Sequence, residues 1–178
     1  LVKKSMVDHG HGQLELWNTE SGYTLGNREA HGGIAGVSNL DHEMMRAYVA
    51  QSLALAASAG VRRYFWYAWD NGTTGMASPD GGRPLPGGIA YSQVVNWLRG
   101  RTVRDCGKFK NTFWSCIVDD TGREARIVWS IGEVKPLRPE DDWKVDAWQS
   151  LDGSIMPLLG AGVVNIGPTP VLFIPTGY

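Results

Sequence analysis

The hydrophobic and polar positions change character a little past the middle of the chain. In the first part, residues 13–19 (QLELWNT) and 61–69 (VRRYFWYAW) carry apolar side chains on both faces, as buried parallel strands do. A helix is predicted between them over 41–59, with Asp41 capping its start and Gly60 following its end. The order strand, helix, strand predicts a βαβ unit with parallel strands.

Each predicted strand of this first part is followed by a long loop and then a helix. The loops, over 22–39 and 71–88, are rich in glycine, and the second predicted helix covers 89–99. Long loops at the carboxyl ends of strands are typical of (β/α)8 barrels and equally of open doubly wound sheets.

The remainder of the chain reads as β structure. Short runs of β-branched and aromatic residues are separated by turn signals and predict strands over 112–118, 125–130, 145–150 and 171–174. These strands predict a small antiparallel β-sandwich. We therefore divide the chain into two predicted domains, residues 1–100 and residues 101–178.

Length and charge exclude several classes of protein. The 178 residues are too few for a complete eight-stranded α/β barrel, which needs about 200. A formal charge of −1 provides no basic surface for nucleic acid. No apolar run approaches the roughly 20 residues that cross a bilayer, so we expect no membrane anchor. The chain contains eight Trp and six Tyr. Such residues fill a hydrophobic core, but aromatic rings also stack on the apolar faces of sugars.

Cys106 and Cys116 lie close together in strand-like sequence, which suits a disulfide between neighbouring strands. Two buried free thiols are the alternative. No His or further Cys stands nearby to complete a tetrahedral set, so we predict no metal site here. We expect no cofactor elsewhere in the chain either. A disulfide would indicate a secreted or periplasmic protein.

The clearest chemical signal is the segment 17–22 (WNTESG). Strand alternation places Leu16, Asn18 and Glu20 on one face. A carboxylate that closes an apolar strand is not buried without a partner, so we expect it at the strand's carboxyl end, where α/β barrels keep catalytic groups. The alternative is that Glu20 caps the following turn or pairs with an arginine.

WNTESGYT, together with the helix that follows it, RRYFWYAWDN and the helix AYSQVVNWLRG, resembles the last quarter of a retaining glycoside hydrolase barrel. The similarity is to the (β/α)8 superfamily with its nucleophile on strand 7, among relatives of the β-xylosidase and α-L-iduronidase group or similar endo-glycosidases. RDCGKFKNTFWSC and REARIVWS resemble the β-sandwich that follows such barrels. The resemblance implies an α/β plus all-β chain: a partial (β/α)8 barrel, then a small β-sandwich.

The resemblance gives Glu20 the role of a nucleophile that forms a covalent glycosyl-enzyme intermediate. A retaining glycosidase also needs a second carboxyl group about 5–5.5 Å away, which in this superfamily is a Glu after strand 4, usually preceded by Asn. The chain contains no Asn-Glu pair. The remaining glutamates that we considered lack this context: Glu15, Glu29, Glu43 and Glu124. We therefore expect no glycosidase activity from this chain alone.

The resemblance also indicates substrate-binding residues at the end of the second strand. Trp69 and Asp70 match the region whose aromatic residue floors the subsite for the cleaved sugar. Trp66 is the alternative, because strand alternation sends the two tryptophans to opposite faces. Asn18 and Tyr67 are weaker candidates for polar contacts, and ordinary strand packing explains them equally well.

The implied partners are an oligo- or polysaccharide substrate and the missing N-terminal part of the same barrel. Without that part, aromatic faces and strand edges would be exposed, and the chain should self-associate. We expect a secreted or periplasmic protein whose signal peptide lies outside this chain. The alternative from a different class is a non-catalytic carbohydrate-binding or structural β module, in which Glu20 is structural.

Overall fold

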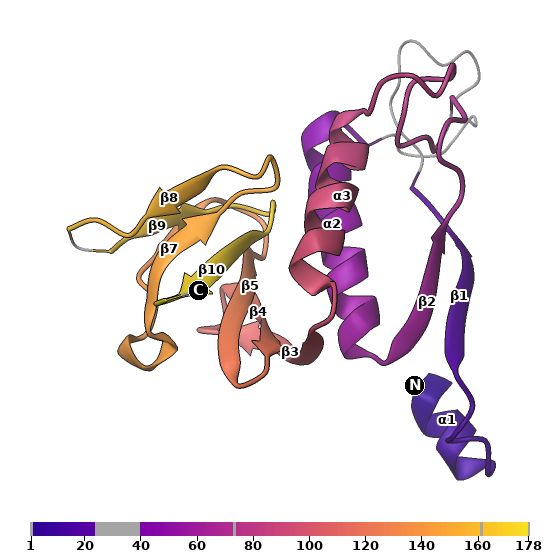
Figure 1. Ribbon diagram of the computed structural model, residues 1–178, viewed down its shortest axis with the longest axis horizontal. Helices are drawn as coiled ribbons and strands as arrows, with labels where there is room; N and C mark the ends of the chain where they lie inside the picture. Colours follow the sequence, from indigo (N-terminus) through magenta and orange to yellow (C-terminus); the bar gives the residue numbers. More distant parts are fainter. Residues whose placement is uncertain (1, 24–39, 73, 161, 178) are drawn as a thin grey trace.

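The computed structural model describes the chain except for residues 1, 24–39, 73, 161 and 178, so most of the predicted loop over 22–39 lies outside the described residues. Three layers follow one another in Figure 1: a two-stranded parallel sheet, a pair of helices, and a larger antiparallel sheet. The first part of the chain forms α1 (Val2–Asp8), β1 (Leu16–Ser21), α2 (His42–Ser58), β2 (Val61–Trp66) and α3 (Pro86–Leu98).

The predicted βαβ unit is confirmed, because β1 and β2 pair in parallel and α2 lies between them in the chain. The predicted helix caps are confirmed as well. The Asp41 side chain accepts a hydrogen bond from the Met44 N–H at 2.7 Å. Gly60, just past the helix, has φ +78°, which glycine adopts without steric cost. The local signals of the sequence therefore set both ends of α2.

Strands β1 and β2 differ from the prediction in their limits and in their burial. β1 continues to Ser21, and β2 ends at Trp66, three residues before the predicted end. The predicted burial on both faces is wrong, since Trp17 is 48% and Phe65 49% exposed. The helices cover one face of this sheet, and within the described residues nothing covers the other (Figure 1).

Helix α3 begins three residues earlier than predicted, at Pro86, because proline fits the first turn of a helix, where its missing N–H is not needed. The loop before it folds back onto the helices, so that Met76 and Leu85 are buried. Trp97, near the end of α3, is 2% exposed, and its Nε1 donates to Gln149 Oε1 at 2.9 Å. This bond joins the helix layer to the antiparallel sheet.

The second part of the chain is antiparallel β structure, as predicted. Its strands are β3 (Thr102–Phe109), β4 (Phe113–Asp120), β5 (Arg123–Ser130), β6 (Lys135–Leu137), β7 (Val145–Gln149), β8 (Ile155–Pro157), β9 (Val164–Ile166) and β10 (Val171–Pro175). Six of them form a sheet in the order β3-β4-β5-β10-β7-β8, and β6 pairs with β9. The four predicted strands correspond to β4, β5, β7 and β10; the other four were not predicted.

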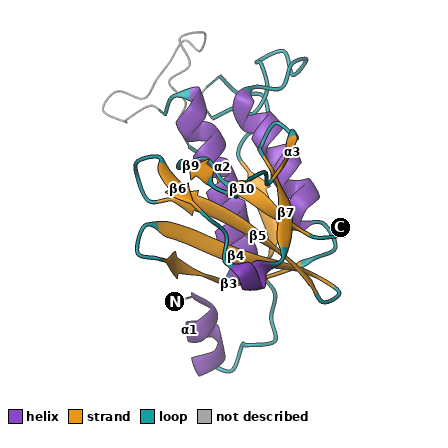
Figure 2. Ribbon diagram, turned by 90° about the vertical axis from the view of Figure 1, so that its left-hand side faces the viewer, coloured by secondary structure: helices purple, strands orange, loops and turns teal. Residues whose placement is uncertain are grey.

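The six-stranded sheet has apolar residues on both faces, and Figure 2 shows the helices behind it. The cluster on the helix side contains Met45, Val49, Leu53, Val94, Trp97, Val103, Cys116, Val118, Ile127, Trp129 and Leu172. The cluster on the side of β6 and β9 contains Phe113, Val128, Leu137, Trp143, Val164, Ile166, Val171 and Phe173. The helices of the first part and the sheet of the second part thus share one core.

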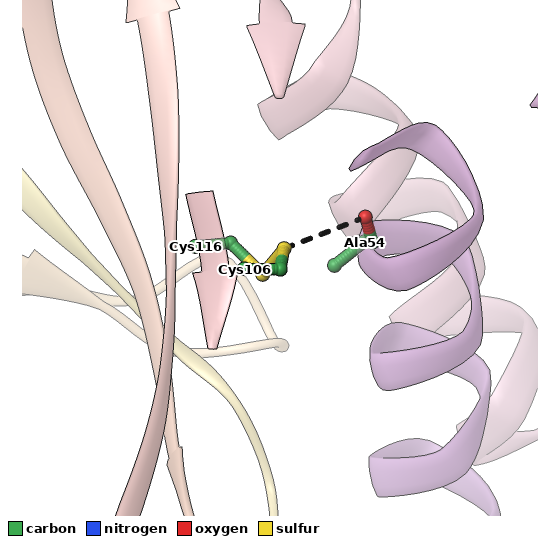
Figure 3. Close-up of a disulfide and its surroundings, with 3 residues drawn as sticks. All are labelled: Ala54, Cys106 and Cys116. Carbon is green, nitrogen blue, oxygen red and sulfur yellow. Dashed lines mark hydrogen bonds between the residues drawn. A yellow bond between two sulfur atoms is a disulfide. The ribbon is translucent and has the colours of Figure 1, made fainter. Parts of the chain in front are cut away.

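The predicted disulfide joins Cys106 of β3 to Cys116 of β4, with their Cα atoms 4.1 Å apart. The pairing of β3 with β4 is irregular next to Cys106, where Asp105 has φ +51°. Cys116 is fully buried, and Cys106 Sγ lies 4.0 Å from the carbonyl oxygen of Ala54 in α2 (Figure 3). The disulfide therefore packs against the helix layer.

Candidate active site

Glu20 lies one residue before the end of β1, and the strand pairing decides which way it faces. Asn18 pairs with Tyr64 and Ser21 pairs with Trp66. Between these two pairs β1 moves on by three residues and β2 by two, so β1 contains one extra residue. Paired residues share a face of the sheet. Asn18 and Ser21 are accordingly half-buried on the helix side, whereas Glu20 is exposed. The extra residue of β1 thus directs Glu20 to the open face.

The prediction that Glu20 shares a face with Leu16 and Asn18 is therefore wrong. It assumed unbroken alternation, which an inserted strand residue interrupts. A second irregularity lies at the start of the pairing, where Leu16 pairs with Val61 but Trp17 pairs with Arg63. Here the extra residue is in β2. The two irregularities therefore cancel, and the last pair has the same offset between the strands as the first pair.

Ser21 and Gly22 hold the backbone after Glu20 against β2. Ser21 Oγ accepts a hydrogen bond from the Tyr64 hydroxyl at 2.9 Å, and the Ser21 carbonyl accepts one from the Tyr67 N–H at 2.8 Å. A Cβ at Gly22 would lie 2.4 Å from the Tyr67 carbonyl oxygen. The Ser-Gly pair therefore lets the chain leave β1 in close contact with the end of β2.

The Glu20 carboxylate forms no hydrogen bond or ion pair within the part of the chain that the structure describes. The arginines of the adjacent strand contact other residues. Arg62 Nε lies 3.8 Å from Glu15 Oε1, and the Arg63 guanidinium lies 4.8 Å from the centre of the Trp17 ring. The described residues thus leave the Glu20 carboxylate accessible from the open face.

The two candidate tryptophans occupy different environments. Trp66 is half-buried among the helix-side residues, and its Nε1 donates to the Thr74 carbonyl at 2.8 Å. Trp69 lies beyond the end of β2 and is 47% exposed. Its backbone carbonyl accepts hydrogen bonds from Met76 N at 2.7 Å and Ala77 N at 2.8 Å. Trp69 therefore has a ring available to a ligand and a backbone that is fixed.

The other candidates divide in the same way. Tyr67 is 58% exposed and Asp70 is exposed, both just after β2. Asn18 is half-buried on the helix side. The end of the parallel sheet thus carries four exposed side chains, those of Glu20, Tyr67, Trp69 and Asp70, whereas Asn18 is half-buried on the helix side.

The other glutamates considered from the sequence do not serve as a second carboxyl group beside Glu20, because the described ones are either distant along the chain or paired with arginines. Glu15 lies five positions earlier, roughly 16 Å away along a strand. The hydrogen bond from Trp17 Nε1, and then the charge of Arg62, lower the pKa of Glu15 and favour its ionised form, against the burial effect. Glu43 and Glu124 are held in ion pairs with arginines. Glu29 lies outside the described residues.

The described residues contain no group of three or more His, Cys, Asp and Glu side chains placed to hold a metal ion. Their helices include none long and apolar enough to cross a bilayer.

Thr74 was not identified from the sequence. Its hydroxyl lies within hydrogen-bond distance of the backbone of Tyr67 and Ala68, at the end of β2. A threonine in a glycine-rich loop carries no motif, and only the folded backbone reveals this contact.

Among known proteins, similarity was found in structure alone. No family model and no curated protein matches the chain. A family 39 glycoside hydrolase from Bacteroides cellulosilyticus superposes on 97% of the chain, with a TM-score of 0.73 and 20% identity. A GH30 endoxylanase from Clostridium papyrosolvens superposes on 94%, with a TM-score of 0.59 and 11% identity. The chain spans 37% and 42% of these two proteins. It has the fold of one part of each.

Proposed function

We propose that this chain is the C-terminal part of a retaining glycoside hydrolase that cleaves oligo- or polysaccharides, with Glu20 as its nucleophile. In this proposal β1 and β2 are the last two strands of a (β/α)8 barrel. Strands β3 to β10 form the accessory β-sandwich that follows it. Support comes from the fold shared with two glycoside hydrolases, each much longer than this chain.

The observation that carries the proposal is the position of Glu20. It lies at the carboxyl end of a parallel strand, on the face opposite the helices, and no described residue forms a hydrogen bond or ion pair with its carboxylate. In an α/β barrel the face opposite the helices points to the interior, and catalytic groups lie at the carboxyl ends of the strands. A packing or capping role would instead require partners for the carboxylate.

The proposed chemistry begins with attack of a Glu20 carboxylate oxygen on the anomeric carbon. The glycosidic C–O bond breaks, and the leaving oxygen takes a proton from a second carboxyl group. That group, now ionised, removes a proton from water, whose oxygen attacks the anomeric carbon and releases Glu20. Trp69 offers an aromatic floor for the sugar, with Tyr67 and Asp70 as neighbouring polar groups.

The second carboxyl group must come from another part of the barrel, so the chain alone is proposed to be inactive. The same missing strands would cover the open face of β1 and β2. In their absence the exposed aromatic residues of that face favour self-association. The disulfide fits a secreted or periplasmic enzyme, since such bonds persist in oxidising compartments.

The proposal is tested on a longer protein in which this chain is preceded by six barrel strands. Glu20→Gln should lower the rate of aryl-glycoside hydrolysis by several orders of magnitude, because an amide does not serve as the nucleophile. A 2-deoxy-2-fluoro glycoside should trap the intermediate, and mass spectrometry should locate the sugar on the peptide that contains Glu20.

Glu15→Gln is the matched control, since Glu15 precedes the same strand and is also exposed. It should leave the hydrolysis rate within about threefold of the parent. Unchanged turnover in Glu20→Gln would remove Glu20 from the mechanism. Sugar binding without hydrolysis in every form would instead favour the carbohydrate-binding module, and neither binding nor hydrolysis would favour a structural module.

A further inference from the structure

One side chain, that of Thr74, holds the peptide bond just beyond β2. Thr74 Oγ1 lies 2.7 Å from the Tyr67 carbonyl oxygen, to which it donates, and it accepts from the Ala68 N–H at 3.0 Å. Both groups belong to the peptide bond between Tyr67 and Ala68. Trp69 follows this peptide directly. The orientation of the Trp69 backbone therefore depends on the Thr74 hydroxyl.

Thr74 is itself fixed on both sides. Its N–H donates to Asn71 Oδ1 at 2.6 Å, and its carbonyl accepts from Trp66 Nε1 at 2.8 Å. The Trp66 ring packs against the helix-side core. These contacts connect the loop that carries Thr74 to the helix-side core, so the hydroxyl is held in place before any ligand arrives.

The same peptide bond is contacted from the side of β1. The Tyr67 N–H donates to the Ser21 carbonyl at 2.8 Å, and Gly22 packs directly on the Tyr67 carbonyl oxygen. A Cβ at Gly22 would also lie 3.4 Å from Thr74 Cβ. The backbone just after Glu20 therefore contacts the backbone just before Trp69, and the Thr74 side chain packs beside this contact.

We propose that Thr74 is a positioning residue that sets Trp69 relative to Glu20. This inference rests on the proposed glycosidase function and deepens it. Stacking of an aromatic ring under a sugar depends on where the ring lies and how it is tilted, so a displaced ring binds the sugar more weakly. Thr74 acts only through the peptide bond between Tyr67 and Ala68 and does not touch the substrate.

The first experiment needs only this chain. The Ala68 amide should exchange with solvent deuterium at least tenfold more slowly than an unstructured amide, because Thr74 Oγ1 accepts its proton. Exchange at the unstructured rate would overturn the proposal without any variant having to fold.

Two variants then separate the hydroxyl from the shape of the side chain. Thr74→Val keeps the shape and removes the hydroxyl, and it should abolish protection at Ala68 and shift the Trp69 indole NMR signal. Thr74→Ser keeps the hydroxyl and should restore both. The Trp97 indole, bound to Gln149, is the internal control and should not move. Identical spectra at Ala68 and Trp69 in Thr74→Val and the parent would overturn the proposal.

The longer active protein provides the kinetic test. Thr74→Val should raise KM for an aryl glycoside by about tenfold and leave kcat within about threefold, since stacking acts on ground state and transition state alike. Thr74→Ser should restore KM. An unchanged KM, or a Thr74→Ser variant as impaired as Thr74→Val, would overturn the proposal. If the longer parent protein hydrolyses no aryl glycoside although Glu20 is intact and the Ala68 amide is protected, the glycosidase function fails and the contact made by Thr74 does not.

Discussion

Removal of the disulfide should lower the stability of the chain by an amount that follows from its short loop. Cys106 and Cys116 are 10 positions apart. A cross-link that closes a loop of about ten residues lowers the entropy of the unfolded chain enough to stabilise the fold by about 2.7 kcal/mol. Cys116 is also fully buried, so its replacement by alanine removes packing contacts. We expect Cys106→Ala/Cys116→Ala to lose about 3 kcal/mol.

Urea unfolding followed by tryptophan fluorescence measures this loss. For a chain of this size, 3 kcal/mol corresponds to a fall in Tm of about 6–12 °C. The reductant supplies the control: it should lower the unfolding midpoint of the parent and leave that of the double variant unchanged. A stabilising disulfide is refuted if the oxidised parent and the double variant unfold at the same urea concentration, or if the native parent contains titratable thiols.

Three further outcomes are expected. Gly88→Ala should destabilise the chain by about 1–3 kcal/mol, because its Cβ would lie 2.2 Å from a backbone carbonyl oxygen; Gly107→Ala, with nothing within 4 Å, is the control, and equal Tm values would contradict this. The hydrogen bond from Ser150 lowers the pKa of Asp152 to about 2. The stability that Asp152 contributes relative to Asp152→Asn should hold above about pH 4 and fall away as acid unfolding is followed toward pH 2; a pH-independent difference would contradict it. The isolated chain should self-associate in sedimentation velocity runs and Phe65→Lys should weaken this, whereas a monomer at every concentration would count against an adhesive open face.

Helix α2 could be predicted closely because its signals are local. Apolar residues recur at helical spacing, Asp41 supplies the cap, and Gly60 supplies the left-handed residue after the end. Each signal acts within one or two turns of the chain. The βαβ arrangement followed, since two apolar strands around such a helix pair in parallel.

The strands were predicted less well because their features depend on neighbours. β6, β8 and β9 have three residues each, too few for an alternating pattern to appear. The burial of β1 was wrong because its outer face has no cover among the described residues. The predicted face for Glu20 was wrong because the extra residue of β1 before Ser21 is visible only in the pairing with β2.

For the candidate site, the sequence indicated the chemical groups but not their directions. The motif around Glu20 and the order of Trp66 and Trp69 placed candidates at the strand ends. Which tryptophan packs on the helices, and which is exposed, depended on the register of β2. The contact of Thr74 with the backbone depended on how the following loop folds back, which no local pattern specifies.

The helices α2 and α3 have a sheet on each side, and this arrangement limits how the gene can be divided. A clone that stops after α3 would leave Trp97 and the neighbouring apolar side chains in water, and one that starts at β3 would expose the partner surface that contains Cys116 and Trp129. Either product would be prone to precipitate. Expression of β1 with Glu20, and of the segment after β2 with Trp69, therefore calls for the whole chain, even when only the sugar chemistry is of interest.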